Sequence, residues 1–159
     1  MSEYLLEKFP QAVTMHRVPL GAIPDELKEI HGPATAIKWF RPSRPVADAI
    51  AVFGRRLFLI EGKIFDPNRA IGQLLFYSRL IPSTPELHDY AGYTVIMQLV
   101  TARAPPWASR ADLFPEIQIV EYQPAWIQEY YEHLQNYWTA EKRQGRIQRK
   151  DVLKALGFG

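Results

Sequence analysis

The sequence predicts a single α/β domain whose mixed central β-sheet is flanked by helices. Short segments rich in β-branched and apolar residues, bounded by glycine and proline, alternate with segments whose apolar residues recur every three or four positions. A chain of 159 residues, 47% hydrophobic and 23% charged, can also bury one full core. The expected order is helix, three strands, helix and strand, followed by one more strand and a long C-terminal helix.

Each expected element follows from a local pattern. Gly54 and Arg55 are suited to the tight turn of a hairpin, and Pro124 is suited to the first position of the last helix. The expected helices cover residues 2–9, 25–31, 68–81 and 124–143. The expected strands cover residues 12–20, 35–40, 47–53, 56–64, 93–101 and 117–122. We assign residues 1–139 to the folded domain and 140–159 to a basic C-terminal tail.

Positive charge is concentrated in that tail. Residues 140–159 hold six basic and two acidic side chains, so the tail carries +4, and the rest of the chain carries −2 because the net charge is +2. This division indicates either an anionic or acidic partner for the tail or an ordinary solvated helix end. No apolar run approaches the roughly 18 residues that span a membrane, so we expect no membrane association. The absence of cysteine excludes disulfides and thiolate zinc sites, and it permits a reducing compartment.

Two carboxylates and one lysine form the main candidate site. Asp48 lies at the start of one expected strand, and Glu61 and Lys63 lie at the end of the next. Side chains two positions apart on a strand point to the same face, so Glu61 and Lys63 project together. The hairpin between the strands brings Asp48 towards that pair. The sequence therefore predicts two carboxylates and an ammonium group at the rim of the sheet.

This combination suits phosphodiester hydrolysis assisted by Mg²⁺ or Mn²⁺. Carboxylate oxygens are the ligands that Mg²⁺ prefers, and the metal activates a water and stabilises charge on the phosphate. Lys63 would orient or deprotonate that water, or offset the developing negative charge. Gly62 favours a close backbone approach, and its carbonyl is a further candidate metal ligand. Taken alone, a Glu-x-Lys pair on a strand is typical of an exposed ion pair.

Two residues of the helix expected at 68–81 accompany this site. Gln73 and Tyr77 are four positions apart and therefore lie on one face of the helix. They either form hydrogen bonds around the metal site or a substrate phosphate, or have ordinary roles, with Tyr77 in the core and Gln73 exposed.

Residues 46–81 resemble the PD-(D/E)XK nuclease superfamily. The residues that carry the resemblance are Asp48, then Ile60-Glu61-Gly62-Lys63, then Gln73-Leu74-Leu75-Phe76-Tyr77. The Gln-x-x-x-Tyr segment is similar to the helix motif of the RecB-like branch. The αβββαβ restriction-endonuclease-like core of the superfamily agrees with the expected order of elements. The chain departs from the motif at Ala47, where the motif has proline.

The resemblance implies catalysis by a divalent metal, with Asp48 and Glu61 as ligands and Lys63 as the catalytic lysine. Gln73 and Tyr77 would support the active site. Many members of the superfamily use an additional carboxylate from the first helix, for which Glu3 or Glu7 could serve here, and Glu7 is preferred because it is nearer the sheet.

Seven basic residues are candidates for contacts with DNA. Two lie in the proline-bounded segment before Asp48, two flank Trp107, and three lie in the tail: Arg41, Arg44, Arg103, Arg110, Arg146, Arg149 and Lys150. The first pair either follows the DNA backbone or belongs to an ordinary connection. Trp107 either stacks on an unpaired base or, as we expect, packs on its own proline-rich loop.

An aromatic stripe marks the C-terminal helix. Its members recur every four residues: Trp126, Tyr130, Leu134 and Trp138, with Tyr131 and Tyr137 nearby. Core packing explains most of the stripe. Five aromatic residues still exceed what one helix face buries, which indicates a protein partner or a homodimer contact as a second use.

The function that we expect is a metal-dependent deoxyribonuclease, acting alone or as a subunit of a larger bacterial or phage complex. The resemblance places such a protein in the cytoplasm of a bacterial or phage-infected cell. One alternative is a non-enzymatic nuclease-fold subunit of a nucleoprotein or phage assembly. Another is a non-catalytic DNA-binding module.

Overall fold

The computed structural model describes residues 1–109, 113–137, 144–145, 147–149, 152 and 154. The chain forms two compact units, Met1–Gln123 and Pro124–Gly159. The first unit contains the whole sheet, and the second contains helix α5 (Ile127–Tyr137). The boundary between the units falls before α5, earlier than the start of the basic tail.

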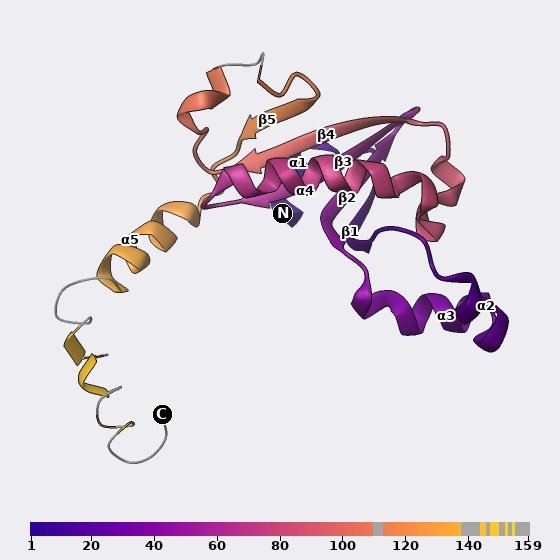
Figure 1. Cartoon of the computed structure of the whole chain (residues 1–159). Coiled ribbons are helices and arrows are strands. Elements are labelled where there is room, and N and C mark those ends of the chain that lie inside the picture. The colour runs from indigo at the N-terminus through magenta and orange to yellow at the C-terminus, as the bar shows by residue number, and fades with distance from the viewer. Residues whose placement is uncertain (110–112, 138–143, 146, 150–151, 153, 155–159) are drawn as a thin grey trace. The chain divides into compact units, whose positions relative to one another are not determined.

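A five-stranded mixed sheet forms the centre of the first unit (Figure 1). Its strands, in both sequence and spatial order, are β1 (Val13–Pro19), β2 (Val46–Phe53), β3 (Arg56–Lys63), β4 (Thr94–Thr101) and β5 (Ile117–Glu121). The first three strands are antiparallel neighbours, whereas β3, β4 and β5 run parallel to one another. The predicted α/β class, with a mixed sheet flanked by helices, is confirmed.

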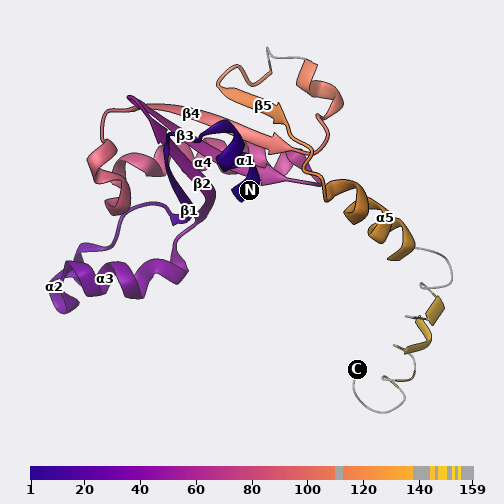
Figure 2. The same ribbon diagram turned by 180° about the vertical axis from the view of Figure 1, so that it is seen from behind.

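Helices α1 (Ser2–Lys8) and α4 (Pro67–Leu80) cover opposite faces of this sheet. Helix α4 lies over the face seen in Figure 1, where its apolar residues share a core cluster with Leu57 and Leu59 of β3. Helix α1 lies over the face seen in Figure 2, where Tyr4 and Leu5 pack against a second cluster that includes Ile60. Successive residues of β3 thus enter different clusters, as the alternation of side chains along a strand requires.

The hairpin between β2 and β3 turns at Gly54 and Arg55, as predicted. Gly54 has a φ of 58°, a left-handed conformation that glycine adopts without a steric penalty. Phe53 pairs with Arg56 across the turn, which sets the register of the whole hairpin. That register brings the start of β2 beside the end of β3.

Two further helices lie between β1 and β2: α2 (Asp25–His31) and α3 (Pro33–Phe40). The expected strand at 35–40 is therefore wrong, because this segment is helical. Pro33 occupies the first turn of α3, where its missing N–H costs nothing, and Gly32 precedes it with a φ of 76°. Proline and glycine thus start a helix whose apolar and β-branched residues resemble a strand.

The remaining elements are short or begin later than expected. Four 3₁₀ helices connect the main elements: Arg41–Ser43, Ile81–Ser83, Pro85–Tyr90 and Pro106–Ser109. Pro124 does not start α5, and its carbonyl instead accepts a hydrogen bond from the N–H of Ile127 at 3.0 Å. Within the described part of the chain, no helix is long and apolar enough to cross a membrane.

Candidate active site

The candidate site lies where β2 and β3 separate. Their paired register ends at Ala49 and Ile60, one position before Asp48 and Glu61. Beyond that point the two carboxylates, and not backbone carbonyls, accept the hydrogen bonds between the strands. The N–H of Asp48 donates to Oε1 of Glu61 at 3.2 Å, and the N–H of Gly62 donates to Oδ2 of Asp48 at 2.9 Å. Each carboxylate therefore binds the backbone of the other strand, and this exchange holds the two acids together.

Lys63 completes the predicted trio. Its Nζ lies 3.2 Å from Oε2 of Glu61, and the two side chains project from the same face of β3 as Leu57 and Leu59. This is the face that α4 covers. Glu61 is only 1% exposed, whereas the Lys63 side chain is 22% exposed. The ammonium group thus lies between a buried carboxylate and solvent.

The carboxylate of Glu61 is poorly neutralised. Burial and the neighbouring charge of Asp48 raise its pKa to about 7, although Lys63 acts in the opposite direction. One lysine therefore does not balance two adjacent acids. A divalent cation would supply the missing positive charge, and Mg²⁺ is commonly held by one or two carboxylates together with waters. The donor set fits such an ion.

Gly62 makes the close approach between these groups feasible. A Cβ at this position would lie 2.9 Å from the Met1 methyl group and 3.8 Å from Oδ2 of Asp48. The first distance is shorter than van der Waals contact allows, so any larger residue would displace Met1. Sequence reasoning anticipated a close approach at Gly62, but nothing in the sequence indicated Met1 as the neighbour.

Gln73 and Tyr77 are joined on α4. Nε2 of Gln73 donates to the Tyr77 hydroxyl at 3.2 Å, and the Tyr77 ring is buried in the core cluster beneath α4. Oε1 of Gln73 is buried and has no hydrogen-bond partner among the described residues. A buried acceptor of this kind normally binds a water or a ligand group. Gln73 is thus neither simply exposed nor fully satisfied.

Glu7 is not brought together with Asp48 and Glu61. Its carboxylate pairs with Lys8 at 2.8 Å, and hydrogen bonds from Lys8 and Tyr122 lower its pKa. Among the residues that the structure describes, no group of three or more His, Cys, Asp or Glu side chains could hold a metal ion. The candidate ligands among the described residues are therefore the two strand carboxylates.

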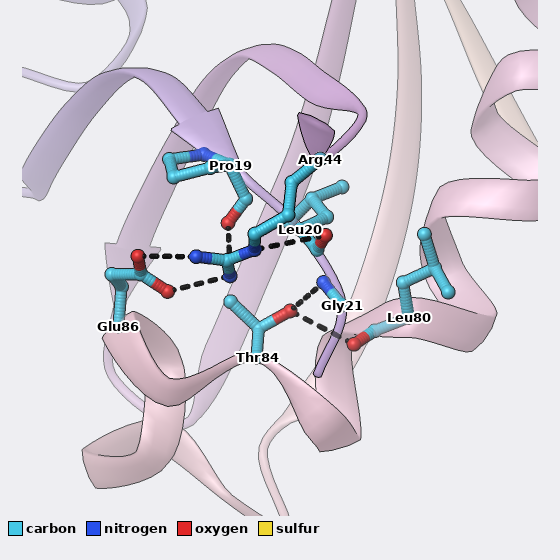
Figure 3. Close-up of polar contacts among 7 residues, drawn as sticks. All are labelled: Pro19, Leu20, Gly21, Arg44, Leu80, Thr84 and Glu86. Carbon is cyan, nitrogen blue, oxygen red and sulfur yellow. Dashed lines mark hydrogen bonds and ion pairs between the residues drawn. The ribbon is translucent and has the colours of Figure 1, made fainter. Parts of the chain in front are cut away.

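Arg44, a candidate for DNA binding, is buried inside the protein (Figure 3). Its guanidinium contacts both carboxylate oxygens of Glu86, at 2.6 and 2.7 Å. It also donates to the carbonyls of Pro19 at 2.9 Å and Leu20 at 3.3 Å. These contacts give Arg44 a structural role in place of the phosphate contact that the sequence suggested.

The other basic candidates for DNA binding are either exposed or outside the residues that the structure describes. Arg41, Arg103 and Arg149 are exposed. Arg110, Arg146 and Lys150 lie outside the described residues.

The expectation that Trp107 packs on its own surroundings is confirmed. Its Nε1 donates to Oδ1 of Asn68 at 2.6 Å, and its ring packs edge-to-face against Phe114. Trp107 is therefore a poor candidate for stacking on a base.

The aromatic stripe is described in part. Trp126 and Tyr130 of the second unit are 42% and 36% exposed and pack edge-to-face, with ring centroids 6.2 Å apart. Trp138 and the side chain of Tyr137 lie outside the described residues.

Comparisons with protein-family models, with curated proteins and with solved structures found no match to this chain. The chemical groups of the site are therefore the basis for inferring its function.

Proposed function

We propose that this protein is a metal-dependent nuclease of the PD-(D/E)XK type that hydrolyses phosphodiester bonds in DNA. The observation that carries the proposal is that the carboxylates of Asp48 and Glu61 each accept a hydrogen bond from the backbone of the other strand, with Lys63 on the second acid. A purely structural cluster has little reason to bury an acid beside another acid, because burial disfavours its charged form. Binding of a cation and a phosphate explains why both acids are kept.

Asp48 and Glu61 are the residues that would hold Mg²⁺ or Mn²⁺. The Gly62 N–H orients Asp48 through Oδ2, and Oδ1 accepts no hydrogen bond from the described residues. Glu61 is oriented through both oxygens, by Asp48 N–H and by Lys63. When bound, such an ion lowers the pKa of a water and stabilises negative charge on phosphate oxygens.

Lys63 serves the reaction through its ammonium group. Its partial exposure leaves that group accessible to solvent, where it can orient the attacking water or stabilise charge on the phosphate. The contact with Glu61 fixes the direction of the long side chain before substrate binds. Such preorganisation is a large part of how enzymes stabilise charge in the transition state.

The order of elements supports the same proposal. Elements α1, β1, β2, β3, α4 and β4 follow the αβββαβ order of restriction-endonuclease-like cores, with α2 and α3 between β1 and β2. The unpaired Oε1 of Gln73 also supports it, because α4 then offers an acceptor to a water or ligand near the face that bears Glu61.

The test is cleavage of linear duplex, branched and single-stranded DNA in Mg²⁺, Mn²⁺, Ca²⁺ or EDTA. We expect cleavage in Mg²⁺ and Mn²⁺, no cleavage in EDTA, and little in Ca²⁺, whose looser coordination positions the water poorly. The Asp48→Asn variant keeps an acceptor for the Gly62 N–H but loses the charge, so its cleavage rate should fall at least about 10³-fold.

Two results would overturn the proposal. One is the absence of cleavage of every DNA by the wild-type protein in Mg²⁺ and Mn²⁺. The other is equal cleavage by wild type and Asp48→Asn, which would indicate a contaminating enzyme. DNA binding without cleavage would instead identify a non-catalytic DNA-binding protein.

A further inference from the structure

Arg17 lies on the strand next to that of Asp48. His16 pairs with Ala49 and Val18 pairs with Ala47. Arg17 and Asp48 stand between these pairs on the two neighbouring strands, at the position where the register is interrupted. Arg17 is therefore the basic residue of β1 that borders the candidate site.

The backbone of Arg17 has an uncommon conformation. Its φ is 51°, and among the described non-glycine residues only Asp66, with a φ of 52°, shares a positive value. The Cβ atom disfavours this region, whereas glycine, which has none, adopts it readily. Residues held in such conformations are concentrated at functional sites.

The guanidinium of Arg17 has no partner among the residues that the structure describes. Arg17 is exposed, and it forms no ion pair or side-chain hydrogen bond with any described residue, even though Asp48 stands at the corresponding position of β2. Arg44, by contrast, makes four contacts through its guanidinium. The sequence therefore places an arginine where glycine would fit the backbone better, and the fold does not use its charge.

The charges of the site indicate what Arg17 binds. Asp48 and Glu61 provide two negative charges, and Lys63 provides one positive charge. With Arg17 the side chains are balanced, and a divalent ion makes the site net +2. This charge matches the negative charge that a phosphodiester carries and increases during hydrolysis. A planar guanidinium with several donors is well suited to phosphate oxygens.

We propose that Arg17 binds a backbone phosphate of the DNA strand beside the bond that is cleaved. The proposal rests on the nuclease function above and adds a residue of β1 to the substrate site. Arg17 thus fixes the position of the strand, while the acids and Lys63 act at the reacting phosphate.

The test compares the Arg17→Gly, Arg17→Ala and Arg17→Lys variants with wild type. The probe is a short fluorescent DNA duplex in Ca²⁺, which allows binding to be measured with little cleavage. We expect Arg17→Gly and Arg17→Ala to weaken binding about tenfold and to reduce the slope of log Kd against log salt by about one. Arg17→Lys keeps the charge but loses the planar set of donors, so its affinity should lie between those of wild type and Arg17→Ala.

Thermal unfolding separates this role from a structural one. Arg17→Gly should raise Tm above that of wild type, because glycine adopts the positive φ without a penalty. A protein that is more stable and yet binds DNA more weakly has lost a contact with DNA and not its fold. Arg56→Ala is the matched control, since Arg56 is exposed at the opposite end of β3 from Lys63 and its loss changes the charge equally.

The outcomes distinguish this proposal from the nuclease function. Wild-type affinity in Arg17→Gly, or an equal loss in Arg56→Ala, overturns the role of Arg17 even if the protein cleaves DNA. Binding that depends on Arg17 without any cleavage overturns the nuclease function alone. Absence of DNA binding by the wild-type protein overturns both.

Discussion

Two ion pairs of the first unit, Arg44–Glu86 and Lys63–Glu61, are built in opposite ways. Arg44 meets both oxygens of Glu86 at 2.6 and 2.7 Å, and two backbone carbonyls accept two more of its hydrogen bonds. Lys63 meets one oxygen of Glu61 at 3.2 Å, and the neighbour of that acid is a second acid, Asp48. The first pair satisfies its charges within the protein, and the second does not.

The pKa values of the two glutamates express this difference. Burial raises the pKa of Glu86, but hydrogen bonds from Arg44 and the charges of Arg44 and Arg41 outweigh it, so the pKa is lowered overall. At Glu61, burial and Asp48 outweigh Lys63 and raise the pKa to about 7. A lowered pKa is typical of an acid held in a structural ion pair, and a buried acid with a raised pKa is typical of a site that binds or reacts.

The largest effect on stability is expected from breaking the first pair. The Arg44→Met variant should lower the free energy of unfolding by roughly 2–4 kcal/mol, mainly because it leaves the two buried carbonyls of Pro19 and Leu20 without their donor. Denaturant unfolding measures this change. Arg41→Met is the control, since Arg41 is exposed, and its effect should be within about 0.5 kcal/mol. Equal effects of the two substitutions would show that the Arg44 pair does not stabilise the fold.

A smaller effect on stability is expected from a change in pH, and its sign is opposite in the two pairs. Glu61 binds its proton more tightly in the folded protein, so its contribution to stability is complete below its ordinary pKa of 4.5 and is lost as pH rises through about 7. This loss should be on the order of 2 kcal/mol. The contribution of Glu86, whose pKa is lowered, is present above its ordinary pKa and is lost as pH falls through the lowered value.

Unfolding measured in EDTA from acid to mildly alkaline pH checks these signs. Glu61→Gln should remove the decline in stability between about pH 5 and pH 8, whereas Glu86→Gln should reduce the decline in acid. Profiles of the two variants that parallel wild type would contradict the assigned environments.

The two regions also differ in how far the sequence predicts them. Asp48, Glu61 and Lys63 could be found because they lie on adjacent strands of one hairpin, where the alternation of side chains and a tight turn determine proximity. Arg44 could not be assigned correctly, because Glu86 is 42 residues away along the chain. Only the tertiary fold brings that pair together. Without that contact in view, the basic residues of the loop before Asp48 suggested DNA binding.

Backbone conformation was the other feature that the sequence did not predict. The segment 35–40 has strand-like side chains, but Pro33 and Gly32 start a helix there. The positive φ of Arg17 and the Met1 contact over Gly62 have no local sequence signal. Sheet class and the remaining main elements followed from hydrophobic periodicity, whereas strained backbone and contacts between distant segments required the three-dimensional structure.

The central claim is that Lys63 and its two acids act on DNA while Arg44 and Glu86 hold the fold. The most direct test measures the rate of DNA cleavage per folded molecule, in Mg²⁺ or Mn²⁺, together with the free energy of unfolding, for Lys63→Ala and Arg44→Met. Lys63→Ala should lower the rate on the order of 10²-fold or more. It should change stability by only about 1 kcal/mol near neutral pH, because Glu61 takes up a proton when its cation is removed. Arg44→Met should lose stability and keep the wild-type rate per folded molecule. A wild-type rate in Lys63→Ala, or an equal loss of rate in both variants, would contradict the account.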